Sequence, residues 1–190
     1  ANQLSFMYDS DVGAGCCSWH PFDGKYFSVA FHDSSVKVWD VETKELAFVL
    51  SGHQQKVFNV LWSPLINGVL ATSSDDKTVG IWKVETDPDR CLAPAPRVKT
   101  IGMNGVLKGH TSNVRALCWS AEHSRILLSG SWDSTIRIWD VVECVCLCIL
   151  ENHAADVYTI VTHTKRPFQF VSASRDNTIR LWELGIVNRR

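Results

Sequence analysis

Apolar and polar residues alternate in short runs along most of this chain. Between Gly109 and Asp140 three such runs cover residues 114–119, 126–131 and 136–139, with polar clusters between them. Alternation over about four to eight residues is typical of strands with one buried face, and the polar clusters are typical of turns. The same pattern predicts strands near the N-terminus over residues 14–19, 26–31, 36–39 and 46–50. The chain is therefore predicted to be all-β.

The strand pattern recurs together with fixed landmark residues. Four tryptophans lie 43, 57 and 43 positions apart, at Trp39, Trp82, Trp139 and Trp182. An aspartate stands six positions before each of them, at Asp33, Asp76, Asp133 and Asp176. A histidine stands 29 positions before the last three, at His53, His110 and His153, whereas Ser10 takes that place in the first unit. A repeat of roughly 40–45 residues indicates an array of similar folded units.

The pairs Gly109-His110 and Trp139-Asp140 bound the most regular repeat. With them the chain resembles the WD40-repeat family, and the resemblance covers nearly its whole length. It implies a β-propeller in which each repeat forms a blade of four antiparallel strands. We expect one propeller segment over residues 1–190, with blades at 10–50, 52–107, 109–150 and 152–184, the last without its fourth strand. Seven such blades need about 300 residues, so we expect the remaining blades to come from the same full-length chain.

The step of 57 residues between Trp82 and Trp139 is longer than the two steps of 43 residues, and the additional residues follow Trp82. This segment includes Pro88, Pro94 and Pro96. Proline lacks the backbone donor that a helix or a central strand needs. We therefore predict a loop insertion over residues 85–104, between the third and fourth strands of blade two.

Composition argues against several functional classes. The net charge of −1 gives no electrostatic footprint for nucleic acid or an anionic membrane. Seven cysteines without a CxxC pair suggest neither a zinc site nor a complete set of disulfides. Free cysteines fit a reducing compartment, so we expect a cytoplasmic protein, with a nuclear location also compatible. Cys144, Cys146 and Cys148 alternate, which predicts that they point to the same face of one strand. We expect no cofactor and no metal.

Each complete repeat brings together a histidine, a hydroxyl residue, an aspartate and a tryptophan. Serine, histidine and aspartate also form hydrolase triads. A nucleophile is not needed three times, however, and an indole can only donate a hydrogen bond. We predict a structural relay from indole to hydroxyl to imidazole to carboxylate, and no enzymatic activity. Alternation allows either of two hydroxyl positions; the family resemblance implies the sets His53, Thr72, Asp76, Trp82; His110, Ser129, Asp133, Trp139; and His153, Ser172, Asp176, Trp182, rather than the alternatives Ser74, Ser131 and Ser174.

The first repeat cannot form this relay. Ser10 replaces the histidine, and Val29 stands where the hydroxyl is needed. We expect blade one to be held by packing alone and to be the least stable blade if it lies at an open edge. The packing residues should be Trp19, Tyr26, Phe27 and Trp39.

The resemblance also points to two partner-contact positions in each complete blade. They are Phe58 and Asp75, Arg115 and Trp132, and Tyr158 and Arg175. Trp132 supports this from its own chemistry, because a turn gains nothing from a large apolar side chain, and Trp, Tyr and Arg are enriched at binding hot spots. We predict a protein or peptide partner there, with no membrane. Two alternatives stay open: Trp132 and Tyr158 cover the end of the propeller, or Arg115 and Arg175 bind nucleic acid, against which Asp75 and Asp156 would act.

Overall fold

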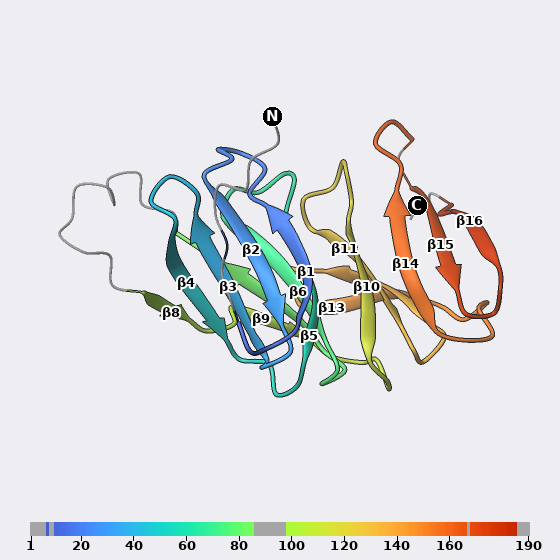
Figure 1. The fold of residues 1–190 in the computed structure, drawn as a ribbon. Coiled ribbons are helices and arrows are strands. Elements are labelled where there is room, and N and C mark those ends of the chain that lie inside the picture. Colours follow the sequence, from blue (N-terminus) through green and yellow to red (C-terminus); the bar gives the residue numbers. More distant parts are fainter. Residues whose placement is uncertain (1–6, 8–9, 86–97, 167, 186–190) are drawn as a thin grey trace, which may run out of the picture.

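The computed structural model describes residue 7 and residues 10–85, 98–166 and 168–185. These residues contain strands and turns and no helix, so none of them forms a helix that could cross a membrane. The strands form four sheets, arranged one after another along the chain like blades (Figure 1). The predicted all-β propeller segment is confirmed.

Blade one has the strands that alternation predicted. They are β1 (Ala14–Trp19), β2 (Tyr26–Phe31), β3 (Ser35–Asp40) and β4 (Glu45–Ser51). A fifth strand, β8 (Lys99–Ile101), pairs in parallel with β4. The end of the range expected as a loop within blade two thus adds a strand to blade one. The three prolines of that range lie outside the described residues, and residues 97–104 contain no proline, so this stretch can donate backbone hydrogen bonds.

The remaining blades follow the same order. Blade two contains β5 (Val57–Trp62), β6 (Val69–Ser74), β7 (Val79–Lys83) and β9 (Gly105–Leu107). Blade three contains β10 (Val114–Trp119), β11 (Ile126–Ser131), β12 (Ile136–Asp140) and β13 (Val145–Leu150). Blade four contains β14 (Val157–Thr162), β15 (Gln169–Ser174) and β16 (Ile179–Glu183), three strands within the described part of the chain.

The buried apolar side chains of the described residues form three clusters, one between each pair of successive blades. Val57 and Trp62 of blade two join the first cluster, Trp119 of blade three joins the second, and Val157 of blade four joins the third. These side chains are at most 5 % exposed. Each blade is therefore held mainly by burying apolar surface against its neighbours.

The outward faces of the first and last blades carry apolar side chains without such cover. On blade four, Ile179 and Leu181 are 77 % and 71 % exposed. On blade one, Trp19 is 60 % exposed. Trp19, which was expected among the packing residues of blade one, lies at the end of β1 on the side turned away from blade two. Among the described rings it contacts Phe27 alone, with ring centroids 5.7 Å apart.

The three cysteines near β13 do not share one face. Trp139 pairs with Cys146 and Ile138 with Cys148, which leaves Leu147 as an extra residue in a bulge. A bulge interrupts the two-residue alternation of a strand. Cys146 consequently packs in the cluster between blades two and three, and Cys148 in the cluster between blades three and four. The prediction failed because it assumed a regular strand.

Candidate partner-binding face and the relays behind it

In blade three the structure joins the four relay residues into one hydrogen-bonded chain. The indole nitrogen of Trp139 donates to Ser129 Oγ at 2.7 Å, and this hydroxyl lies 2.7 Å from His110 Nε2. His110 Nδ1 lies 2.8 Å from Asp133 Oδ2. All four side chains have their polar atoms paired, which is the condition for burying them. The chain links the segment before β10 to β11 and β12.

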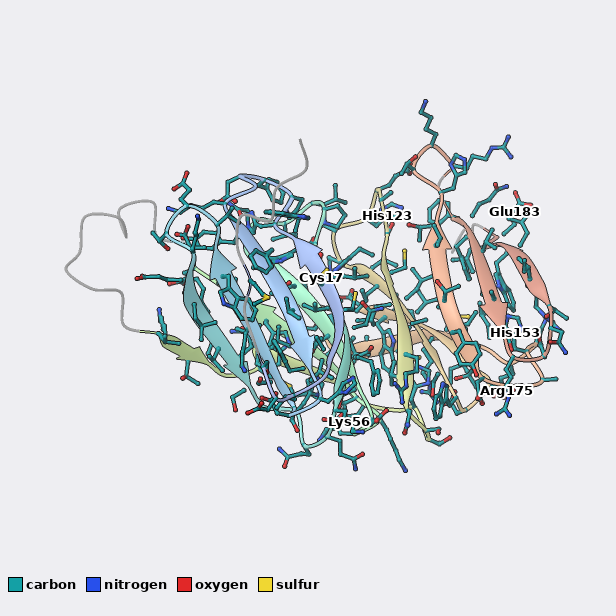
Figure 2. The ribbon with its side chains drawn as sticks, viewed as in Figure 1. Cys17, Lys56, His123, His153, Arg175 and Glu183 are labelled. Atoms are coloured by element: carbon teal, nitrogen blue, oxygen red, sulfur yellow. The ribbon has the colours of Figure 1, made fainter. Side chains whose placement is uncertain are left out.

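Blades two and four repeat this geometry. Histidine to hydroxyl is 2.6 Å for His53 and Thr72 and 2.7 Å for His153 and Ser172. Histidine to carboxylate is 2.7 Å and 2.8 Å, to Asp76 and Asp176. Trp82 and Trp182 donate to the hydroxyls at 2.8 Å and 2.7 Å. Figure 2 shows His153 at the lower end of blade four.

The alternative hydroxyl in each blade has a different task. Ser131 Oγ accepts the backbone N–H of Asp133 at 3.1 Å and donates to the carbonyl of Ser112 at 3.1 Å. Ser74 and Ser174 make the equivalent bonds. These serines therefore brace the turn that carries the relay aspartate.

Sequence reasoning missed a further member of the network. Thr135 donates to Asp133 Oδ1 at 2.7 Å, and its hydroxyl lies 3.3 Å from His110 Nδ1. Thr78 and Thr178 do the same in their blades. A usable signal was present, because a threonine follows each of the three relay aspartates by two positions.

The relays shift the acidity of their members. Burial raises the pKa of Asp133, but the hydrogen bonds from His110 and Thr135 outweigh it and hold that pKa far below the ordinary value of 3.8. The pKa of Asp76 is lowered in the same way. Burial lowers the pKa of His110, with the Asp133 carboxylate acting against it. In blade three the relay therefore favours a neutral imidazole at His110 beside an ionised carboxylate at Asp133.

Blade one uses other contacts. Trp39 stacks on Phe27 with ring centroids 5.5 Å apart and planes 12° apart. Asp33 accepts the hydroxyl of Ser35 at 2.6 Å and pairs with Lys37 at 3.7 Å. The expectation of packing alone is thus wrong, because the turn aspartate keeps polar partners although the histidine is missing.

A bulge places one predicted contact residue at the start of each first strand. Val114 pairs with Ser131 and Ala116 with Gly130, so Arg115 is the extra residue. The register shifts equally around Phe58 in β5 and around Tyr158 in β14. Bulges re-aim side chains and are common next to functional sites. The three residues therefore leave the strand alternation at the same end of their blades.

The structure gathers four of the six predicted contact residues into one cluster around Arg115. The guanidinium carbon lies 3.1 Å from the ring centre of Phe58 and 4.4 Å from that of Trp132. Its Nη2 lies 2.9 Å from Asp75 Oδ1 in an ion pair that lacks the alignment of a hydrogen bond. The guanidinium contacts an aromatic ring of blade two and another of blade three, so these cation–π contacts link the two blades.

The other two predicted residues lie at the same end of blade four. Tyr158 is 49 % exposed, and Trp132 beside Arg115 is 37 % exposed. Arg175 pairs with Asp156 at 3.5 Å, and its side chain is 70 % exposed. Figure 2 shows Arg175 and Lys56 at the lower edge of the molecule. Hereafter the partner face means Phe58, Asp75, Arg115, Trp132, Tyr158 and Arg175.

Replacing Arg115 by lysine is expected to loosen this cluster. Burial lowers the pKa of Arg115, and the nearby Asp75 and Tyr158 offset this effect only in part. Lysine keeps the charge but cannot stack a planar group on both rings. We expect the Trp132 fluorescence to become more accessible to iodide quenching, with a stability loss below about 1 kcal/mol. Unchanged quenching in Arg115→Lys would contradict the stacked arrangement.

Four sheets in succession, three of them pinned by an identical relay, define an array of propeller blades. Comparison with known families agrees: residues 5–40, 44–83, 103–140 and 144–183 match the WD40 family, described as WD domain, G-beta repeat. The chain belongs to the WD40 family.

The chain is similar to proteins with several different roles. It is 30 % identical over 141 residues to the nuclear distribution protein nudF of Aspergillus niger, covering 74 % of this chain and 29 % of that protein. It is 33 % identical over 199 residues to the cell division control protein 4 of Saccharomyces cerevisiae, covering 76 % and 25 %. It is 37 % identical over 90 residues to THO complex subunit 3 of Arabidopsis thaliana, covering 47 % and 25 %. The aligned parts are thus less than a third of these relatives.

Proposed function

We propose that this chain is a non-catalytic scaffold that binds a protein or peptide on the partner face. WD40 proteins are generally interaction scaffolds, which makes the class expected. The observation that carries the finer proposal is the Arg115 guanidinium held between Phe58 and Trp132, with Trp132 still partly exposed. A fixed aromatic and arginine surface costs little conformational entropy when a partner binds.

The burial of the histidines supports a scaffold over an enzyme. His53, His110 and His153 are at most 7 % exposed, and both ring nitrogens of each have partners within the blade. A general base must reach a proton of the substrate. We therefore assign the relays to architecture and propose that recognition takes place on the partner face. Half of that face comes from the first strands, and the other half comes from the turns that hold the relay aspartates.

We further propose that blades outside these 190 residues pack on the two open apolar faces, around Trp19 and around Ile179 and Leu181. Each internal blade buries an equivalent face against its neighbour, and these two are exposed. Cytosol or nucleus is the location we propose for this scaffold, on the basis of its cysteines.

Alanine at Trp132 tests the partner face. We expect capture of the partner set from cell extract, measured by quantitative mass spectrometry, to fall at least about tenfold, because hot-spot aromatics carry much of the binding energy. The melting temperature should hardly change, because Trp132 lies in a turn and not in a blade core.

The matched control is Phe22→Ala, at another exposed aromatic that is 50 % exposed and lies in the turn between β1 and β2. It should leave capture intact. If Trp132→Ala lowered the melting temperature strongly, or if both variants lost the same proteins, the partner face would be a cover for the propeller and not a binding site.

Nucleic-acid binding remains the alternative prediction, with less support. Both arginines that would contact phosphate lie beside a carboxylate: Arg115 pairs with Asp75, and the more exposed Arg175 pairs with Asp156. Retention on immobilised nucleic acid that falls steeply with salt would favour this alternative over a peptide partner.

A further inference from the structure

The last position of the first strand holds a tryptophan in blades two and three but not in blade four. Trp62 pairs with Leu70, and Trp119 pairs with Leu127. In blade four the same place is taken by Thr162, which pairs with Phe170. Each tryptophan is 5 % exposed and fills the space toward the preceding blade.

A cavity of about 140 Å³ lies where the third indole would be. Its apolar wall includes Ile126, Leu128, Ile138 and Phe170, together with Thr162 itself. By strand register these four wall residues correspond to Val69, Ala71, Ile81 and Leu127, which form the apolar cluster with Trp119. The cavity thus has the walls of an indole site and lacks the indole.

The polar contact of the missing side chain is only partly replaced. Trp119 donates its indole N–H to the carbonyl of Leu61 in the preceding blade at 3.1 Å. Thr162 donates its hydroxyl to the carbonyl of Trp119 at 3.0 Å. A threonine therefore keeps one bond across the two blades but cannot fill the volume, and an unfilled apolar cavity of this size can bind an aromatic ring.

The cavity opens at the end of the molecule opposite to the partner face. Its lining also includes His123, whose ring is tilted by 33° against that of Phe168 with centroids 5.2 Å apart, and the polar residues Glu122, His163 and Arg166. Figure 2 shows His123 at the upper edge of blade three, far from Lys56 and Arg175. Polar groups around an apolar pocket suit a side chain presented by a polypeptide, whose backbone stays at the rim.

We propose that this cavity is a second binding site, which takes the tryptophan side chain of a partner polypeptide into the place that Trp62 and Trp119 fill in the other blades. The ring of the guest packs on Ile126, Leu128, Ile138 and Phe170. The site is independent of the partner face, since no residue belongs to both.

Titration with N-acetyl-tryptophanamide, followed by NMR of methyl groups, tests the proposal. The methyl signals of Ile126, Leu128 and Ile138 should shift and saturate, and N-acetyl-alaninamide should leave them in place. Absence of saturable shifts would overturn the proposal. Saturable shifts with free indole but not with N-acetyl-tryptophanamide would overturn the proposal that the bound ring belongs to a polypeptide.

Thr162→Trp is the decisive variant because it restores the residue of blades two and three. The amide should lose at least about tenfold in affinity, and the melting temperature should be kept or raised, as expected for a filled cavity. Thr162→Ser is the control and should bind like the unaltered chain. Equal affinity in Thr162→Trp would overturn the assignment of the cavity.

Two further variants keep the result interpretable. Ile126→Phe fills part of the cavity from blade three and should abolish the methyl shifts of Leu128 and Ile138. It replaces Thr162→Trp as the test if that variant does not fold. Trp132→Ala should leave amide binding unchanged. Failure of the partner face and failure of this site are thus separate outcomes.

Discussion

Replacing Asp133 by alanine is expected to lower the free energy of unfolding by about 1–3 kcal/mol, the cost of leaving a buried polar group without its partner. The carboxylate lies 2.8 Å from His110 Nδ1 and accepts the backbone N–H of Thr111 and the hydroxyl of Thr135. All three groups lose an acceptor in the variant. The imidazole itself is buried and cannot turn to water without opening the blade.

Thermal unfolding measures this loss. For a chain of this length, 1 kcal/mol corresponds to roughly 2–4 °C in the melting temperature. Asp33→Ala is the matched control, since Asp33 holds the same place in blade one without a histidine and with a more exposed side chain. It should cost less than about 1 kcal/mol. Equal losses for the two variants would show that the turn, and not the relay, stabilises the blade.

Acidification is expected to destabilise the protein through all three relays. The folded pKa values of Asp76, Asp133 and Asp176 lie far below 3.8. An unfolded chain therefore binds protons at these carboxylates before the folded chain does. Their contribution to stability is complete above the unfolded pKa and is lost as the pH falls below it. The lowered pKa of His110 acts in the same direction, beginning as the pH falls below 6.5.

The free energy of unfolding, measured with a denaturant at a series of pH values from 7 to 2, tests this expectation. The free energy of unfolding should decline gently below pH 6.5 and steeply below about pH 4. The triple variant Asp76→Asn, Asp133→Asn, Asp176→Asn should start lower and show a much flatter curve in the acidic range. Parallel curves for the two proteins would mean that other carboxylates cause the acid sensitivity.

The fold could be predicted from the sequence because each strand buries one face. The strands expected over residues 14–19, 26–31, 114–119 and 126–131 occur at those bounds. Strand β8 could not be predicted in this way, because three residues are too few to show alternation and their partner β4 lies about fifty positions earlier. The sequence pattern could not predict the bulges either. The bulge at Leu147 places Cys148 on the opposite face of β13 from Cys146.

Some residues of the candidate sites could likewise be predicted from the sequence, and others could not. Repetition revealed the relay residues, and it could also have revealed Thr135 and its two counterparts. The repeats also indicate the cavity, because Thr162 in blade four takes the place of Trp62 and Trp119 in blades two and three. That signal has meaning only once strand register shows the three positions to be equivalent. The Arg115 cluster needed coordinates, because its members come from two blades and a bulge aims the central residue.

The relays and the partner face are physically connected. Asp75, Trp132 and Arg175 each directly precede a relay aspartate in its turn. The backbone N–H of Trp132 donates to the carbonyl of Asn113 at 2.9 Å, and the other two blades have the same bond. A turn fixed at the aspartate therefore holds the neighbouring contact residue in a defined place, which is the preorganisation that a binding surface needs.

Hydrogen exchange of the indole N–H groups tests the central role of the relays most directly. Trp82, Trp139 and Trp182 donate to buried hydroxyls, so their indole protons should exchange far more slowly than that of the exposed Trp19. In Asp133→Ala the exchange of Trp139 should accelerate more than that of Trp82 or Trp182. Exchange of Trp139 in the unaltered protein as fast as that of Trp19 would contradict the account.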